Sequence, residues 1–214
     1  GDIVTTFQRS SFDGPGISSR GSINDPDAIN KAMANQQAVI HLAAKVTPLG
    51  SWKDFYSINV EGTRALHAAA AAEGVSRFIY ISTPSVGHSG SSISGESALP
   101  AMPDKVIGHY ARSKAIAESW LLQQSNISLP VVALRPHLVI GPGDPQLIGR
   151  VVDRALHNRL FTVGPGLALV DTTWVDNAAS ATIAALDRCE FLAGKALVVS
   201  NGEPRTIFEL FSQI

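Results

Sequence analysis

The sequence has few cysteines, few charges and no long apolar run, and each shortage excludes a class of protein. Cys189 is the only cysteine among 214 residues, which excludes an internal disulfide framework and a cysteine-based zinc cluster and favours a reducing, cytoplasmic location. Charged residues make up 16% of the chain, its formal net charge is −1, and Lys and Arg form no dense run, so we expect no nucleic-acid partner. Because no apolar run approaches the roughly 20 residues that cross a bilayer, we expect no membrane span.

What the chain does contain is an alternation of short apolar runs and helical stretches. The runs are continuous and rich in β-branched residues, as in strands buried on both faces of a parallel sheet; they cover residues 3–7, 38–44, 77–82, 131–136 and 196–200. The stretches between them predict helices at 25–36, 54–74, 108–125 and 145–160. This order predicts an α/β fold with a doubly wound parallel Rossmann-type sheet. The alternation weakens after Pro136, so we divide the chain into a Rossmann domain, 1–136, and a small C-terminal substrate lobe, 137–214, with elements that return to the sheet.

Tyr110 and Lys114 stand four residues apart in the predicted helix 108–125, so both side chains share one face. An ammonium group beside a phenol favours the phenolate and lowers its pKa, which would allow Tyr110 to exchange a proton near neutral pH. The alternative is a chance pairing on an amphipathic helix.

Thr83 follows the predicted strand 77–82 and therefore lies at the sheet edge where ligands bind in open α/β folds. Its hydroxyl could donate to a carbonyl oxygen that Tyr110 protonates. The alternative for Thr83 and Ser82 is a cap of the next turn. Residues 84–106 then form a loop long enough to predict a functional or mobile segment.

The order of the segments AVIHLAAKV, NVEGTRALHAAAAAEGVSRFIYIST, YARSK, LRPHLVIGPGD and VDTTWVDNAA resembles the extended short-chain dehydrogenase/reductase superfamily over nearly the whole chain. Within it, STPSV, YARSKAIAE and SNGEP most resemble the 3-beta-hydroxysteroid dehydrogenase-like branch, and there the bacterial 2-alkyl-3-oxoalkanoate reductases. The resemblance implies Tyr110 as the acid/base, Lys114 on the nicotinamide ribose and Thr83 on the reacting oxygen. The residues that it implies for cofactor contact are Arg9, Ser10, Ser22, Ile23, Leu42, Ala43, Ala44, Asn59, Lys114, Pro136, Leu138 and Val139. The residues that it implies for substrate contact are Lys45, Pro84, Ser85, His88, His137 and Thr172. For Asn59 a structural hydrogen bond explains the residue at least as well, and for each histidine a surface or core role is the preferred interpretation.

The sequence departs from that family in lacking the glycine-rich turn whose amides hold the cofactor pyrophosphate. The GPG triplets at 14–16 and 164–166 do not follow a first strand and open a helix. We therefore expect an opening βα unit of about 30 residues before Gly1, and further residues of the lobe after Ile214.

The residues that select the cofactor are also unusual. Arg9 follows the first predicted strand, with no acid until Asp13, and the family's Gly-Asp pair is Gly21–Ser22. An acidic residue suits the ribose of NAD whereas arginine suits a 2′-phosphate, so NADP(H) is favoured over NAD(H). The alternative is that Arg9 points to solvent.

Together these observations predict an NAD(P)-dependent oxidoreductase that reduces the ketone, or oxidises the alcohol, of a hydrophobic small molecule. We expect its pocket between the 84–106 loop and residues 137–175. The resemblance also implies a homodimer paired through helices 55–73 and 107–124, and the alternative is that both helix faces are covered within the chain. A nucleotide-sugar epimerase or dehydratase is one alternative, although a dehydratase usually has an acid where Pro84 stands. A non-catalytic cofactor-binding regulator is the other. No metal site is expected, because the six histidines lack ligand spacing with supporting acids.

Overall fold

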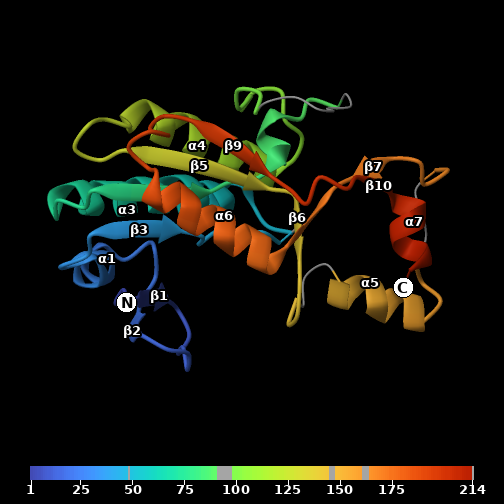
Figure 1. The fold of residues 1–214 in the computed structure, drawn as a ribbon, viewed down its shortest axis with the longest axis horizontal. Helices are drawn as coiled ribbons and strands as arrows, with labels where there is room; N and C mark the ends of the chain where they lie inside the picture. Colours follow the sequence, from blue (N-terminus) through green and yellow to red (C-terminus); the bar gives the residue numbers. More distant parts are fainter. Residues whose placement is uncertain (48, 91–97, 145–147, 161–163, 214) are drawn as a thin grey trace.

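A four-stranded parallel sheet forms the centre of the molecule (Figure 1). The computed structural model describes residues 1–47, 49–90, 98–144, 148–160 and 164–213. The strands lie in the order β3–β4–β5–β9, with bounds Ala38–His41, Arg77–Ile81, Val131–Pro136 and Ala196–Val199. All three pairings are parallel. These four strands match four of the five predicted runs, and β5 lies buried at its centre because both of its faces are covered.

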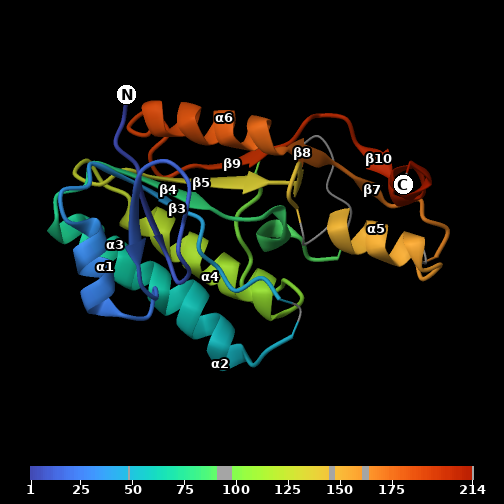
Figure 2. The same ribbon diagram turned by 90° about the horizontal axis from the view of Figure 1, so that it is seen from below.

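Helices cover both faces of this sheet (Figures 1 and 2). On one face lie α1, α3 and α4, at Pro26–Met33, Gly62–Ala72 and His109–Gln124; on the other lies α6, at Val175–Asp187. One apolar cluster joins Phe78 and Tyr80 of β4 to Leu66 and Leu121 of the first helical layer. A second joins the opposite sheet face to Ala185 and Cys189. The two clusters confirm the doubly wound arrangement.

The chain starts with a separate parallel pair, β1 at Thr5–Gln8 and β2 at Ile17–Arg20. The apolar run 3–7 predicted β1, although the strand begins two residues later, at Thr5. Nothing predicted β2, because its sequence ISSR has one apolar residue and its side chains are mostly exposed. The first GPG triplet leads into this strand, with Gly16 at φ +110°, and not into a helix.

The last third of the chain divides between the main sheet and elements outside it. β9 is the edge strand of the main sheet, and α6 packs on its face. The other elements are β6 (Leu138–Ile140) paired with β8 (Thr172–Trp174), β7 (Leu169–Val170) paired with β10 (Arg205–Thr206), and the helices α5 (Ile148–Leu156) and α7 (Ile207–Ser212). Figure 1 places β7, β10, α5 and α7 beyond the ends of β5 and β9 toward which the strand arrows point. The helix predicted at 145–160 is shorter: α5 ends at Leu156, and residues 145–147 lie outside the described part of the chain.

Two short irregular helices flank the carboxyl edge of the sheet. After β3, α2 (Trp52–Phe55) runs into the π-helical turn η1 (Tyr56–Glu61), which continues as α3. After β4, the 3₁₀ turn η2 (Pro84–Gly87) begins the predicted loop, of which residues 91–97 are not described. Among the described residues, we find no helix with the length and apolar character needed to cross a membrane.

Candidate active site

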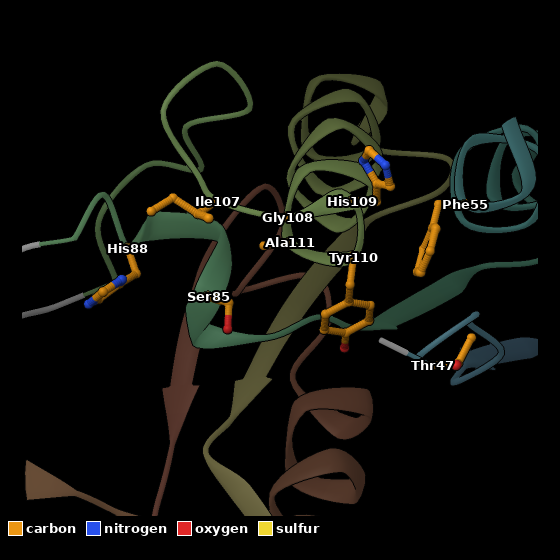
Figure 3. Close-up of a pocket in the computed structure, with 9 residues that line it drawn as sticks. All are labelled: Thr47, Phe55, Ser85, His88, Ile107, Gly108, His109, Tyr110 and Ala111. Carbon is orange, nitrogen blue, oxygen red and sulfur yellow. The ribbon is translucent and has the colours of Figure 1, made fainter. Parts of the chain in front are cut away.

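Tyr110 lies in the first turn of α4, at the edge of a cavity of about 470 Å³. The preceding Gly108 has φ +90° and ψ 152°, a conformation that is essentially restricted to glycine, and this sharp entry starts the helix at His109. Figure 3 shows the phenol of Tyr110 directed between Ser85 and Thr47. The cavity is lined by Thr47, Phe55, Ser85, His88, Ile107, Gly108, His109, Tyr110 and Ala111.

The pKa of Tyr110 differs from the sequence prediction. Burial raises it, and only a hydrogen-bonding interaction with the Thr83 side chain opposes that rise. The predicted lowering by Lys114 is therefore wrong for this structure. The ammonium group is turned to other partners, and loss of water around the phenol outweighs its charge. Tyr110 thus holds its proton at neutral pH.

Lys114 is buried beneath the sheet edge, with 2% of its surface exposed. Its Nζ donates to the carbonyl oxygen of Ile81 at 2.6 Å and lies 3.9 Å from the ring centre of Tyr80. Burial lowers the pKa of Lys114 to about 7, against the opposing charge of Glu118. The amine therefore changes its charge near neutral pH.

Thr83 caps the next turn, which was the alternative considered from the sequence. It precedes η2, where its Oγ1 accepts a hydrogen bond from the Ser85 amide at 3.3 Å. It also interacts with the Tyr110 phenol. Capping fixes the hydroxyl at the end of β4, so the cap positions the group that faces Tyr110.

Asn59 lies in the π-helical turn and joins three segments around the site. Its amide donates to the Lys45 carbonyl at 3.1 Å and to the Ser113 hydroxyl at 2.9 Å, and its oxygen accepts from the Lys45 amide at 2.7 Å. Ser113 in turn donates to the Tyr110 carbonyl at 2.8 Å. These contacts favour the structural alternative for Asn59: it is 1% exposed and holds the start of α4 against the chain after β3.

The residues predicted to contact a cofactor lie in three places. Leu42, Leu138 and Val139 stand at or beyond the carboxyl ends of β3 and β5 with 67%, 40% and 39% of their surfaces exposed, close to Ala43, Ala44 and the half-buried Pro136. Exposed apolar side chains at this edge suit the flat face of a nicotinamide. Arg9 and Ser10 are exposed after β1. Ser22 caps the turn before α1, and Ile23 packs instead against the helical layer near Gly62.

The residues predicted to contact substrate are only partly brought together. Ser85 and His88 line the cavity, and Pro84 opens the turn that carries them. Lys45 lies nearby with its Nζ 5.5 Å from the ring centre of Phe55. His137 and Thr172 are not among the lining residues; the His137 amide donates to Val199, and the Thr172 carbonyl accepts from Asn201.

The cavity beside Tyr110 therefore has only one of the two sides predicted for the substrate pocket, the one formed by the 84–106 loop. The lining residues outside the 84–106 loop come from the chain after β3 and from the start of α4, rather than from residues 137–175. Thr47, Phe55, Ile107 and His109 also line the cavity and were not predicted from the sequence. Thr47 follows a predicted strand just as Thr83 does, so the same argument of position would have found it.

Comparison with known proteins shows what this chain is similar to. The chain is 42% identical over 200 residues to the 2-alkyl-3-oxoalkanoate reductase of Stenotrophomonas maltophilia (strain K279a), covering 91% of this chain and 61% of that protein. It is 36% identical to the enzyme of the same name from Shewanella oneidensis, covering 91% and 53%. The chain thus spans less than two thirds of the length of these relatives.

Solved structures share the fold. The MoeE5 structure superposes with a TM-score of 0.81 at 25% identity, covering 98% of this chain and 72% of that one. A UDP-glucose 4-epimerase of Thermus thermophilus superposes with a TM-score of 0.73 at 26% identity, covering 92% and 67%.

The model of one protein family matches residues 4–214, nearly the whole chain. The predicted resemblance is thereby confirmed, and the chain belongs to the 3-beta hydroxysteroid dehydrogenase/isomerase family.

Proposed function

We propose that this protein is an NAD(P)-dependent oxidoreductase that reduces the ketone of a hydrophobic 3-oxo substrate, or oxidises the corresponding alcohol. The observation that carries the proposal is the Tyr110 phenol at the edge of a cavity, with the Thr83 hydroxyl beside it at the end of β4. The Tyr110 phenol and the Thr83 hydroxyl interact at the carboxyl edge of the sheet, and Lys114 lies one helical turn further along α4. Two adjacent hydroxyl groups at this edge suit a carbonyl oxygen that gains negative charge.

In the reduction, a nicotinamide cofactor supplies the hydride that the carbonyl carbon accepts. Thr83 and Tyr110 donate hydrogen bonds to the carbonyl oxygen, and Tyr110 then transfers its proton to that oxygen to form the alcohol. The raised pKa of Tyr110 suits this direction, because the phenol is protonated at neutral pH. Lys114 would stabilise the phenolate that remains only once its ammonium group turns from the Ile81 carbonyl toward Tyr110.

The residues at the sheet edge fit the nicotinamide half of such a cofactor. Lys114 would hold the ribose of a bound cofactor, and Leu42, Leu138 and Val139 would offer apolar surface to its ring. MoeE5 was solved with NAD, which supports a nicotinamide cofactor in this fold. We propose NADP(H) in preference to NAD(H), because Arg9 is exposed after β1 and can meet a 2′-phosphate.

The substrate class rests on the relatives. Both bacterial relatives are named 2-alkyl-3-oxoalkanoate reductases, and the human relative at 30% identity is a sterol-4-alpha-carboxylate 3-dehydrogenase. In each of these names the carboxylate is attached to the carbon next to the one that is oxidised or reduced, so we propose a hydrophobic 3-oxo acid. MoeE5 was also solved with UDP-glucose, which keeps a nucleotide sugar as the competing substrate.

The test is oxidation of NADPH and of NADH, followed by absorbance, with a 2-alkyl-3-oxo acid, a 3-oxo steroid or a nucleotide sugar as substrate. We expect turnover of the 3-oxo acid with NADPH, and a loss of at least about 100-fold in kcat in Tyr110→Phe. Tyr56→Phe is the matched control, because Tyr56 lies outside the cavity lining. Turnover of the nucleotide sugar alone would favour the epimerase, and turnover that survives Tyr110→Phe would contradict the role of Tyr110. Cofactor binding without any turnover would favour the regulator.

A further inference from the structure

One turn of α4 beyond Lys114 lies a buried carboxylate that the proposed reaction does not use. Glu118 stands four residues after Lys114, so both side chains leave the helix on one face. Glu118 is 0% exposed and Arg135 is 2% exposed. Arg135 of β5 holds the carboxylate with two nitrogens: Nε donates to Oε2 at 3.1 Å and Nη2 to Oε1 at 2.5 Å. A paired, two-point contact is the geometry that permits a carboxylate to remain charged inside a protein.

Arg135 also makes a third hydrogen bond, to a residue outside the Glu118–Arg135 pair. Its Nη1 donates to the carbonyl oxygen of Leu99 at 2.6 Å. The following residues are fixed as well, since the Met102 amide donates to the Val86 carbonyl at 2.8 Å and Val106 packs in a small apolar cluster with Ala111 and Ala115 of α4. The segment 99–106 that Arg135 anchors leads directly into Ile107, which lines the cavity.

The titratable and charged groups around Lys114 come from every element packed against it. His41 of β3 is neutral, because burial lowers its pKa to about 3. Tyr80 of β4 offers its ring face, and burial raises the pKa of its phenol well above the usual range. Tyr110 on α4 is also a neutral phenol. Glu118, with Arg135 behind it, is therefore the negatively charged group that acts on this amine among the described residues; it does so through space, from one helical turn away and without a direct contact.

We propose that Glu118, held by Arg135, is a positioning residue: its carboxylate keeps Lys114 as an ammonium group, and Arg135 ties the same pair to the segment that forms the cavity wall. The consequence for turnover rests on the proposed function, but the consequence for Lys114 does not. Without the carboxylate, the Ile81 carbonyl and the Tyr80 ring face remain to favour the ammonium group against its burial. Glu118 thus acts through Lys114 and touches no reacting atom.

The first experiment follows Lys114 itself, without substrate. The chain has six lysines, so NMR of lysine labelled with ¹³C at Cε and ¹⁵N at Nζ gives few signals, and Lys114→Met assigns the one in question. We expect the Lys114 signal to titrate near neutral pH in the parent protein and at least about one pH unit lower in Glu118→Gln. Glu73→Gln, the same change at an exposed residue after α3, leaves the midpoint unchanged.

A second variant separates charge from folding. If Glu118→Gln does not fold, Glu118→Met combined with Arg135→Met removes both charges, and such a replacement of a buried ion pair by apolar groups often preserves stability. A downward shift smaller than that of Glu118→Gln is expected, because the positive charge of Arg135 is lost together with the carboxylate. An unchanged Lys114 midpoint in whichever of these variants folds would overturn the proposal and leave the pair a structural contact only.

The second readout is the pH profile of the reductase assay. In the parent, activity falls at high pH as Lys114 loses its proton, because the Tyr110 phenol holds its own proton beyond that range. In Glu118→Gln this alkaline limb moves down by the same interval as the NMR midpoint, and Glu73→Gln keeps the parent profile. Should the protein turn over no carbonyl, the proposed function fails while the NMR titration still decides the role of Glu118. A limb that stays in place although the NMR midpoint moves would refute the link to catalysis.

Discussion

His41 shows how a single buried residue can set the response of the whole protein to acid. The Thr63 hydroxyl donates to the Asn59 carbonyl at 2.7 Å, so its oxygen accepts from His41 Nε2, 2.8 Å away, which fixes the proton on that nitrogen. Burial, and to a smaller extent the charge of Lys114, lowers the pKa of His41 to about 3. In the unfolded chain the pKa of this imidazole is its ordinary value of 6.5, so between pH 6.5 and 3 the unfolded state binds the extra proton and acid destabilises the fold.

We therefore predict that the free energy of unfolding falls as pH drops through this window, with His41 contributing at most about 1.4 kcal/mol per pH unit. Urea unfolding at a series of pH values from about 7 to 4 measures the slope. His41→Gln retains an N–H donor for Thr63 but does not titrate, so its slope is smaller. His157→Gln, at an exposed position just after α5, keeps the parent slope. Equal slopes in the parent and His41→Gln would rule out His41 as the source.

At the scale of the element, the entry to α4 depends on one backbone conformation. Gly108 is at φ +90° and ψ 152°, where a residue with a side chain is strained by about 1–3 kcal/mol. Gly108→Ala is predicted to lower the free energy of unfolding by that amount and to move Tyr110 away from Thr83, so that kcat falls as well. Gly74→Ala is the matched control. Gly74 is also at positive φ, +72°, and an added Cβ would meet no atom there within 4 Å. It follows α3 and lies far along the chain from Tyr110. We expect Gly74→Ala to lower the free energy of unfolding by about 1–2 kcal/mol and to leave kcat unchanged. Thermal unfolding and the reductase assay test both, and full activity in Gly108→Ala would contradict the positioning role.

The same scale explains which elements the sequence could predict. The strands of the main sheet and the helices α1, α3 and α4 were predictable because burial on both faces leaves continuous β-branched runs, and the helices between them keep their periodic apolar faces. β2 carried no such signal because its residues are mostly exposed. The short strands β7 and β10, of two residues each, are defined by their partners and not by their own composition.

In the site, spacing along α4 predicted the Tyr110–Lys114 pair, since both belong to one helix. The wall formed by Thr47 and Phe55 comes from a segment after β3 that meets α4 only in the folded chain, through Asn59. The direction of the Tyr110 pKa was missed for a related reason: desolvation depends on everything packed around the phenol, and the order of residues does not give it.

At the scale of the whole molecule, the outer side of the helical layer is where we expect two copies to pair. Arg64 of α3 lies 5.4 Å from the ring centre of Trp120 of α4, and Ala68 on α3 is exposed. Small residues on a helix let a second helix approach closely, and in a two-fold dimer each residue near the axis meets its own copy. The homodimer predicted from the sequence would use this surface, and the alternative is that solvent alone covers it.

Sedimentation equilibrium distinguishes the two, with an expected mass of about twice 22.6 kDa in the parent. Ala68→Arg places a charged side chain against its symmetry mate, and like charges brought together in this way cost enough to weaken association about tenfold or more. Ala179→Arg makes the same change at an exposed position of α6, on the opposite face of the sheet, and the dimer persists. If the parent sediments as a monomer at all concentrations, the pairing is wrong. If Ala179→Arg and not Ala68→Arg dissociates the dimer, the interface lies on the α6 face, and the helices that carry Tyr110 and Lys114 keep their outer side in water.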